Sequence, residues 1–376
     1  MAENDTIAVT AQCLCKTHTF TTNVTQSSLP LPASCCHCTS CRRVSGAMYT
    51  SCTAWPNPSE NLSALKQYTF GTNTVFSCAT CSTPLFCKGP NTGNVPWVAT
   101  GALHNTPGLV DYKIHIFVGD TVDGGAAVWL PHHTHDGQPA KRLREGRGSE
   151  TLSATWPGRP ELSAKGLGAG PAPERTRFRC HCNGVDFSLR SGRDLRDAPK
   201  QDLQRWFVHT QTLKYTGSLE CCDSCRSAFG SDLIGWSFAP LSHVEFAGGD
   251  DAFGAAEFPR TVAALREAVD SADKDARLGT LAYYQSSPDV ERYFCSTCSA
   301  SVFYAVHDRT DMVDIAVGLL DHPDGARAEG LLSWRLDKVG WAADAAGGWR
   351  EELATTAHEL QQEYAEATGR SKGAPA

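Results

Sequence analysis

Residues 34–42 read Ser34-Cys35-Cys36-His37-Cys38-Thr39-Ser40-Cys41-Arg42, with four cysteines within seven positions. Cys36, Cys38 and Cys41 form a C-x-C-x-x-C run, whose thiolates can surround one soft metal ion. Structural zinc sites are closed by four protein ligands, whereas catalytic sites keep one position free. Two interpretations follow: a zinc ion with an open position, or a site closed by Cys35, His37 or a distant residue.

The cysteine usage of the whole chain favours metal ligation over disulfides. The 376 residues include 17 cysteines, an odd number, and most stand in C-x-C or C-x-x-C pairs. The N-terminal residues Met1 to Asp5 show neither a basic region nor an apolar run, so no signal peptide is expected. In a reducing compartment such pairs are typical of metal sites. We therefore expect a cytosolic or nuclear protein.

Composition and charge exclude several classes of function. The net charge is -7 and the sequence pI is about 6.0, which argues against general binding to nucleic acids or membrane surfaces. No apolar stretch approaches the roughly 18 residues that a membrane helix needs. A glycine-rich phosphate loop and a G-x-S-x-G motif are both missing from the sequence. ATP use and serine hydrolysis therefore lack support.

The cysteine groups occur twice in the same order, which predicts a tandem repeat of one domain. Cys180-His181-Cys182 repeats Cys13-Leu14-Cys15, and residues 222–226 (CDSCR) repeat residues 38–42 (CTSCR). Residues 295–298 (CSTC) repeat residues 78–81 (CATC). The predicted segments are a first domain, a Gly/Pro-rich and charged linker, a second domain, and a C-terminal helix with tail: 5–136, 137–174, 175–345 and 346–376.

The strand pattern predicts a mainly β fold in both domains. Short alternating segments such as 48–55 and 112–118 are separated by turn residues, as in small antiparallel sheets. Two helices are expected from apolar spacing and composition, at 258–269 as an insertion in the second domain and at 349–367 near the end. Gly369 is positioned to terminate the second helix.

The outer cysteine pairs of each domain form a complete set of four ligands. Four thiolates close a tetrahedral zinc site, and metal binding then contributes directly to folding. We predict two structural zinc ions with the following ligands: Cys13, Cys15, Cys78 and Cys81 in the first domain, and Cys180, Cys182, Cys295 and Cys298 in the second.

Taken together, these motifs are similar to those of the glutathione-dependent formaldehyde-activating family, also called the centromere protein V family. The resemblance covers Cys13 to about Trp129 and, more weakly, Arg179 to about Trp334, and includes His115-Ile116-Phe117. It implies a β-tent fold in each domain, one structural zinc ion, and a second zinc ion on the C-x-C-x-x-C cysteines. It also implies carbon–sulfur lyase chemistry, with S-hydroxymethylglutathione as the substrate associated with named members.

The resemblance assigns roles within the first domain. Cys36, Cys38 and Cys41 match the reactive-site zinc ligands, and His37 matches the histidine of the motif. Arg42 is a candidate for attracting a substrate carboxylate, with an internal salt bridge as the alternative. His115 is a candidate acid or base near an open zinc ion, with a structural histidine as the alternative.

The second domain departs from the motif at the reactive site. Cys222 and Cys225 align with Cys38 and Cys41, but Glu220 stands where Cys36 does and Cys221 where His37 does. Glutamate can ligate zinc, so the sequence leaves open whether a metal binds here. A weakened or lost site is the favoured interpretation, and the second domain then serves as a scaffold or as a wall of a shared pocket.

Several further residues are candidate sites. His132-His133-Thr134-His135 can bind metal, although a histidine-rich loop beside a linker is more often incidental. His104 is a second acid–base candidate, and Cys52 and Cys87 are expected as small buried residues.

The sequence thus predicts a zinc-dependent carbon–sulfur lyase whose active site lies in the first domain. Its substrate is a small molecule, a glutathione or other thiol adduct, and neither nucleic acid nor membrane is expected as a partner. Two alternatives remain: an enzyme that modifies a larger biosynthetic intermediate with zinc as a Lewis acid, and a non-catalytic zinc scaffold for a protein partner. The oligomeric state does not follow from the sequence.

Overall fold

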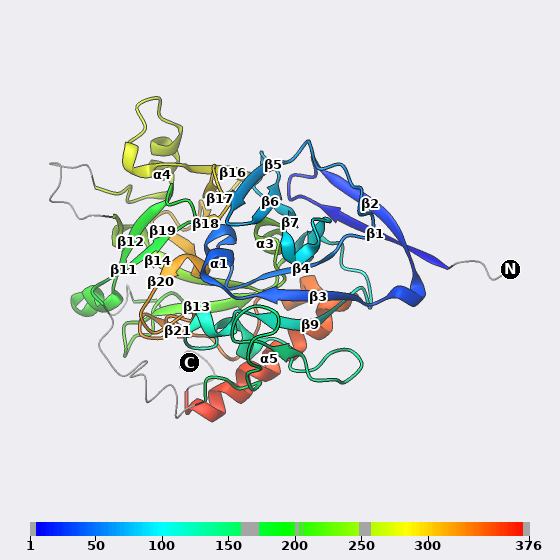
Figure 1. Cartoon of the computed structure of the whole chain (residues 1–376). Coiled ribbons are helices and arrows are strands. Elements are labelled where there is room, and N and C mark those ends of the chain that lie inside the picture. The colour runs from blue at the N-terminus through cyan, green and yellow to red at the C-terminus, as the bar shows by residue number, and fades with distance from the viewer. Residues whose placement is uncertain (1–4, 159–172, 200–202, 205, 248–256, 371–376) are drawn as a thin grey trace.

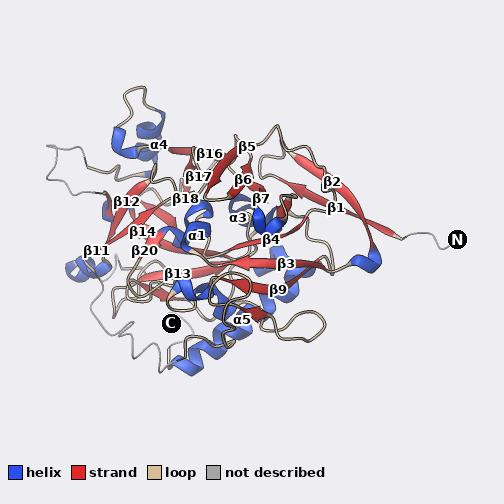
Figure 2. Ribbon diagram, in the orientation of Figure 1, coloured by secondary structure: helices blue, strands red, loops and turns tan. Residues whose placement is uncertain are grey.

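The computed structural model describes residues 5–158, 173–199, 203–204, 206–247 and 257–370. Strands dominate these residues, as Figure 2 shows, and short helices connect them. The first half contains β1 (Thr6–Gln12), β2 (Thr19–Thr25), η1 (Gln26–Ser28), β3 (Leu31–Cys36), α1 (Thr39–Ser45), β4 (Thr50–Ala54), β5 (Lys66–Phe70), β6 (Asn73–Ser77), β7 (Pro84–Lys88), η2 (Pro90–Thr92), β8 (Trp97–Ala99), η3 (Thr100–Ala102), β9 (Val110–Ile116), η4 (Val118–Thr121), η5 (Gly125–Trp129) and β10 (Lys141–Arg142).

The second half contains a similar series of elements and ends in the longest described helix. Its elements are β11 (Arg175–Arg179), β12 (Asp186–Arg190), η6 (Gly192–Asp197), β13 (Tyr215–Glu220), α3 (Asp223–Phe229), β14 (Ile234–Pro240), η7 (Leu241–His243), β15 (Val244–Phe246), α4 (Val262–Asp270), η9 (Ala276–Leu278), β16 (Leu281–Ser287), β17 (Val290–Cys295), β18 (Ser301–Val306), β19 (Met312–Ala316), η10 (Val317–Leu319), β20 (Leu320–Asp321), β21 (Leu332–Trp334), η11 (Ala342–Ala345) and α5 (Trp349–Thr368).

The mainly β prediction is confirmed, and so are the two predicted helices. The helix expected at 258–269 begins later, at Val262, because the side chain of Thr261 caps it by accepting a hydrogen bond from the Ala264 N–H. The helix expected at 349–367 is α5, and Gly369 ends it in the left-handed conformation. None of the described helices is long and apolar enough to cross a membrane.

The two main sheets have the same strand order. The first is β10-β9-β3-β4-β8-β7-β6-β5, and the second, taken in the matching direction, is β21-β13-β14-β19-β18-β17-β16. A parallel pair lies at the same place in each sheet, β3 with β9 and β13 with β21, and in the first sheet β10 also pairs with β9 in parallel. The remaining strands of the two halves form a two-stranded sheet, β1-β2, and a four-stranded sheet, β15-β12-β11-β20.

The α1 and α3 helices show how closely the local structures of the two halves correspond. Cys38 caps the start of α1 and Cys222 caps the start of α3, each with its sulfur accepting a hydrogen bond from the backbone N–H three residues later. Gly46 and Gly230 end these helices with φ angles of 84° and 67°, which a residue with a Cβ rarely adopts. Figure 1 shows both helices near the centre of the molecule.

The two halves meet through a pair of equivalent contacts around these helices. The Gly318 N–H on η10 donates to the Gly46 carbonyl at 2.9 Å, and the Gly101 N–H on η3 donates to the Gly230 carbonyl at 3.2 Å. The η10 helix of the second half therefore contacts α1 of the first half, and η3 of the first half contacts α3 of the second, as in a two-fold symmetric interface.

Gly318 is expected to tolerate no side chain at this interface. A Cβ there would lie 2.0 Å from the carbonyl oxygen of Ala47 and 2.5 Å from that of Gly46, and backbone atoms cannot move aside cheaply. We expect Gly318→Ala to lower the free energy of unfolding by about 3 kcal/mol, measured by denaturant titration. Gly146→Ala is the control, because its Cβ would meet only Phe117, at 3.5 Å. Equal destabilisation by both variants would contradict this view of the interface.

A buried carboxylate adds a polar contact between the halves. Asp232 is fully buried and accepts hydrogen bonds from the hydroxyls of Ser51 and Tyr112 in the first half. The guanidinium of Arg350 on α5 donates to the same carboxylate at 2.7 Å. Because a buried charge is costly unless it is paired and hydrogen-bonded, these contacts fix α5 against both halves.

Residues 137–158 differ from the predicted solvated linker. Arg142 on β10 is buried and donates to the carbonyls of Ala127 and Leu130, while Leu143, Leu152 and Trp156 belong to the described apolar core. The β10 strand also pairs with β9, so this stretch extends the first sheet. Composition misled because Arg142, which counts as a solvated charge, is buried and donates to backbone carbonyls. Residues 159–172 of the predicted linker lie outside the described residues.

Candidate metal centre and pocket

Two groups of four cysteines lie where structural zinc sites were predicted. In each group the four sulfur atoms lie within 4.8 Å of one another. Four sulfurs at about 2.3 Å from a zinc ion would be about 3.8 Å apart, so the groups fit one ion each. They consist of Cys13, Cys15, Cys78 and Cys81 in the first half, and Cys180, Cys182, Cys295 and Cys298 in the second.

The electrostatics of these groups suit metal ligation. Hydrogen bonds from Cys13 and Cys81 lower the pKa of the Cys78 thiol, which favours a thiolate in the group. Hydrogen bonds from the surrounding cysteines likewise lower the pKa of Cys295. The same hydrogen bonds raise the pKa of Cys13 and Cys180, so within each group one thiol is favoured as a thiolate and another would release its proton on binding a metal.

A third group consists of Cys36, Cys38 and Cys41. Cys36 ends β3, Cys38 caps α1, and Cys41 lies in its first turn; the Cys36 and Cys38 sulfurs are 3.5 Å apart. Hydrogen bonds from Cys36 and Cys41 lower the pKa of the Cys38 thiol to about 3, helped by the backbone N–H of Cys41 and by Arg42. In the described residues no fourth His, Cys, Asp or Glu ligand joins this group.

The three-cysteine group lies in a cavity of about 1060 Å³. Its floor includes Cys52 on β4, and aromatic side chains such as Trp97 and Phe117 form part of its walls. Residues from outside the first predicted domain also line it: Arg144, Glu145, Arg147 and His181. A cavity of this volume lies at the upper end of the range typical of small-molecule sites.

Two of these pocket residues are held by specific contacts. The guanidinium of Arg147 donates to the Ser34 hydroxyl at 2.9 Å. His181 comes from the second half, and its Nδ1 lies 2.8 Å from the Tyr68 hydroxyl on β5. Sequence reasoning missed both residues, although the basic cluster at 141–147 was a signal and His181 stands between two predicted ligands.

The structure places His37 and His115 outside the pocket. Both are fully buried, and His37 Nε2 lies 3.1 Å from His115 Nδ1. Burial lowers the pKa of His37 to about 3 and also lowers that of His115, so both are neutral near pH 7. The predicted acid–base role of His115 thus lacks a path to the substrate, and the pair forms a support behind the cysteines.

Arg42 is also removed from the pocket. It is buried, its Nε donates to the His37 carbonyl at 3.2 Å, and its Nη2 donates to the Thr39 hydroxyl at 3.0 Å. Arg226 makes the equivalent contact with the Cys221 carbonyl at 2.9 Å in the second half. The same geometry in both halves holds the cysteine loop, and these internal contacts favour a structural role for Arg42 over the predicted contact with a substrate carboxylate.

The second half has a structural counterpart to residues 115–117, although its sequence shows no clear equivalent of His115-Ile116-Phe117. Phe117 and Trp341 both have positive φ angles, of 56° and 57°. Three residues later, Asp120 and Asp344 accept hydrogen bonds from the first residues of α1 and α3. The equivalent of 115–117 is therefore 339–341, with the exposed Trp341 in the position where Phe117 lines the pocket of the first half.

Other predicted candidates lie elsewhere. His132, His133 and His135 line a separate cavity of about 820 Å³ beside α5, and they form no metal-binding group among the residues that the structure describes. Cys52 and Cys87 are only partly buried, in contrast to the expectation, and their sulfurs lie 3.7 Å apart.

The fold brings the cysteines together in three groups that could each hold a metal ion, two with four thiols and one with three. Residues 8–120 match the model of the glutathione-dependent formaldehyde-activating enzyme family. Neither a curated protein nor a solved structure matches the chain. The matched range includes both first-half cysteine groups and ends before the loop that carries Arg147.

Proposed function

We propose that this protein is a zinc-dependent lyase of the carbon–sulfur type, acting on a thiol adduct of a small aldehyde. One observation carries the proposal: Cys36, Cys38 and Cys41 form a three-thiol group that opens into a large cavity and has no fourth protein ligand among the described residues. The family match of residues 8–120 supports this chemistry. The dependence on reduced thiols suits the cytosol or nucleus.

Cys36, Cys38 and Cys41 would hold the zinc ion, and their thiolate character fits that metal. When bound, zinc would supply a Lewis acid that stabilises negative charge on a sulfur or oxygen of the substrate. The two four-cysteine groups are closed sets, so they support the fold and leave the reaction to the third group.

The pocket walls would bind and orient the substrate. The Arg147 guanidinium lies at the cavity with only the Ser34 hydroxyl as its described partner, so it is available for a carboxylate. His181, which comes from the second half, would also line the bound substrate. Trp97 and Phe117 would shield the reacting atoms from water.

The proposal is tested by following exchange between glutathione, formaldehyde and their adduct by NMR. In the forward direction the thiol sulfur bonds to the aldehyde carbon, the C=O double bond becomes single, and the thiol proton ends on the oxygen. We expect the zinc-loaded protein to accelerate formation and breakdown equally, as a catalyst must. If neither glutathione nor another thiol exchanges faster, the lyase proposal fails and the scaffold alternative is favoured. Acceleration only with larger thiol adducts would indicate a tailoring enzyme.

Arg147→Ala is expected to raise KM about 10-fold and to change kcat little, because a carboxylate contact remote from the reacting atoms contributes uniform binding. Arg147→Lys should recover part of the loss, since lysine keeps the charge but not the paired donors. Arg193→Ala, a change on η6 of the second half, is the matched control. Unchanged KM in Arg147→Ala would remove this residue from the substrate site.

A further inference from the structure

The reactive site of the second half can be compared with that of the first, position by position. Cys36 on β3 pairs with Thr50 on β4, and Glu220 on β13 pairs with Ile234 on β14. The Val75–Cys87 pair of β6 and β7 corresponds in the same way to the Arg292–Tyr304 pair of β17 and β18. Val75 and Arg292 each lie three residues before the first cysteine of a C-x-x-C pair, Cys78 or Cys295. Cys87 and Tyr304 each lie nine residues after the same cysteine.

At the second site a guanidinium lies against the remaining cysteines. Arg292 Nη1 is 3.6 Å from the Cys225 sulfur, and Arg292 Nη2 donates to the Ser224 hydroxyl at 2.7 Å. Arg292 is buried, with 8% of its surface exposed. A buried cation beside a cysteine pair supplies the positive charge that a metal ion would otherwise bring.

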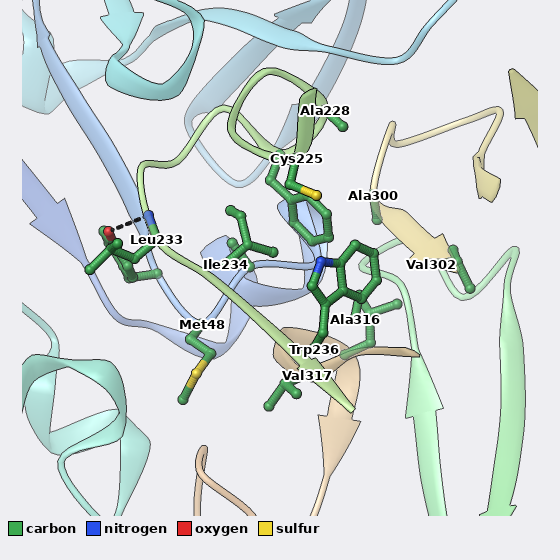
Figure 3. Close-up of a cluster of buried hydrophobic side chains, with 14 of the residues drawn as sticks. Met48, Cys225, Ala228, Leu233, Ile234, Trp236, Ala300, Val302, Ala316 and Val317 are labelled. Atoms are coloured by element: carbon green, nitrogen blue, oxygen red, sulfur yellow. Dashed lines mark hydrogen bonds between the residues drawn. The ribbon is translucent and has the colours of Figure 1, made fainter. Parts of the chain in front are cut away.

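Larger side chains in the second half take the positions that line a cavity of about 100 Å³ beside Cys41 in the first half. Cys52 pairs with Ala99, and its equivalent Trp236 pairs with Ala316. Figure 3 shows the Trp236 indole in the cluster that contains Cys225, beside Ala316. The indole ring lies 6.2 Å from that of Tyr304, and the Arg292 guanidinium lies over the Tyr304 ring at 4.8 Å. Trp236, Tyr304 and Arg292 thus stand where the first half has the smaller side chains of Cys52, Cys87 and Val75.

The candidate metal ligands of the second site also differ from those of the first. Cys222 and Cys225 keep the positions of Cys38 and Cys41 at the start of a helix, but Glu220 replaces the third thiol. Among the described residues these three do not form a group with ligand atoms within 4.8 Å of one another. The residues at this site therefore do not fit the zinc ion that the family pattern implies.

We infer that the second half binds no metal at Cys222 and Cys225, and that Arg292 permanently occupies the place of the ion. The chain then holds three metal ions: one in each four-cysteine group and one at Cys36, Cys38 and Cys41. This inference concerns metal content alone and does not depend on the proposed reaction.

The first test counts zinc ions per intact chain by native mass spectrometry. We expect three for the natural sequence and three again for the double variant Cys222→Ser/Cys225→Ser, because serine still caps α3. Four ions in the natural chain, falling to three in the double variant, would overturn the inference.

A reciprocal exchange tests the role of the guanidinium directly. Val75→Arg places an arginine at the equivalent position of the first half and should lower the count from three to two, since the guanidinium competes for the thiolates. Val75→Leu is the matched control and should keep three. Retention of three ions by a folded Val75→Arg chain, with unchanged circular dichroism, would show that an arginine here does not exclude metal.

The opposite exchange removes the arginine and restores the third thiol. Glu220→Cys/Arg292→Val should raise the count to four, whereas Glu220→Cys alone should stay at three because the guanidinium remains. A fourth ion in the single variant would overturn the claim that Arg292 takes the place of the metal. Each readout is independent of activity, so a failed lyase proposal would leave these results unaffected.

Discussion

Replacing Cys38 by serine is expected to remove one zinc ion per chain and to reduce turnover of the thiol adduct by roughly 1000-fold. The sulfur of Cys38 accepts the Cys41 N–H and lies 3.5 Å from that of Cys36, so it is central to the three-cysteine group. Loss of a Lewis acid that stabilises the transition state costs about 4 kcal/mol at this fold-change. Serine keeps the helix cap, so stability should fall by less than about 2 kcal/mol.

The matched control for Cys38→Ser is Cys222→Ser, the same change at the same cap of α3. Turnover and zinc content are measured together, by adduct exchange and by native mass spectrometry. Cys222→Ser should leave turnover unchanged. A Cys38→Ser chain that keeps full turnover would contradict the placement of the reaction in the first half.

Replacing Cys298 by serine is expected to have the largest effect on folding. Cys298 belongs to a four-cysteine group that joins the loop after β11 to the turn between β17 and β18, and it is fully buried. Structural zinc sites contribute apparent binding free energies of about 10–16 kcal/mol, comparable to the whole stability of a domain. We expect the second half to unfold, seen as lost near-ultraviolet circular dichroism and rapid proteolysis.

The same variant should also weaken the active site, because His181 stands between two ligands of this group and lines the pocket of the first half. Cys225→Ser serves as the control, since that cysteine is buried in the same half but belongs to no metal-binding group in the described part of the chain. Equal protease resistance of the two variants would mean that the four-cysteine group is dispensable for folding.

The grouping of the cysteines could be predicted from the sequence because metal chemistry fixes which residue types and spacings work together. C-x-C and C-x-x-C pairs keep two sulfurs within reach of one ion whatever the surrounding fold. The strands and the C-terminal helix followed from apolar spacing and from Gly369. The domain boundaries at 5–136 and 175–345 remain predictions.

The residues that shape the two sites could not be predicted, because they depend on strand register and on the contact between halves. Arg292 is near Cys225 only because β17 and α3 pack together, although the two are 67 positions apart in the sequence. His181 reaches the first pocket through the interface around Gly46 and Gly318. Arg147 was hidden in a stretch whose composition resembles a linker. His37 and His115 were candidates by type alone, and their burial decides against a direct role.

The central claim, an open metal position at Cys36, Cys38 and Cys41, is tested most directly by cobalt(II) substitution. The visible absorption of cobalt(II) reports its coordination, so glutathione should change the spectrum if its sulfur can join the ion. We predict that glutathione changes the absorption of one cobalt ion per chain, and that the Cys38→Ser variant shows no such spectral change. A natural chain whose cobalt spectrum is unaffected by saturating glutathione would show a site closed by protein ligands, and would contradict the account.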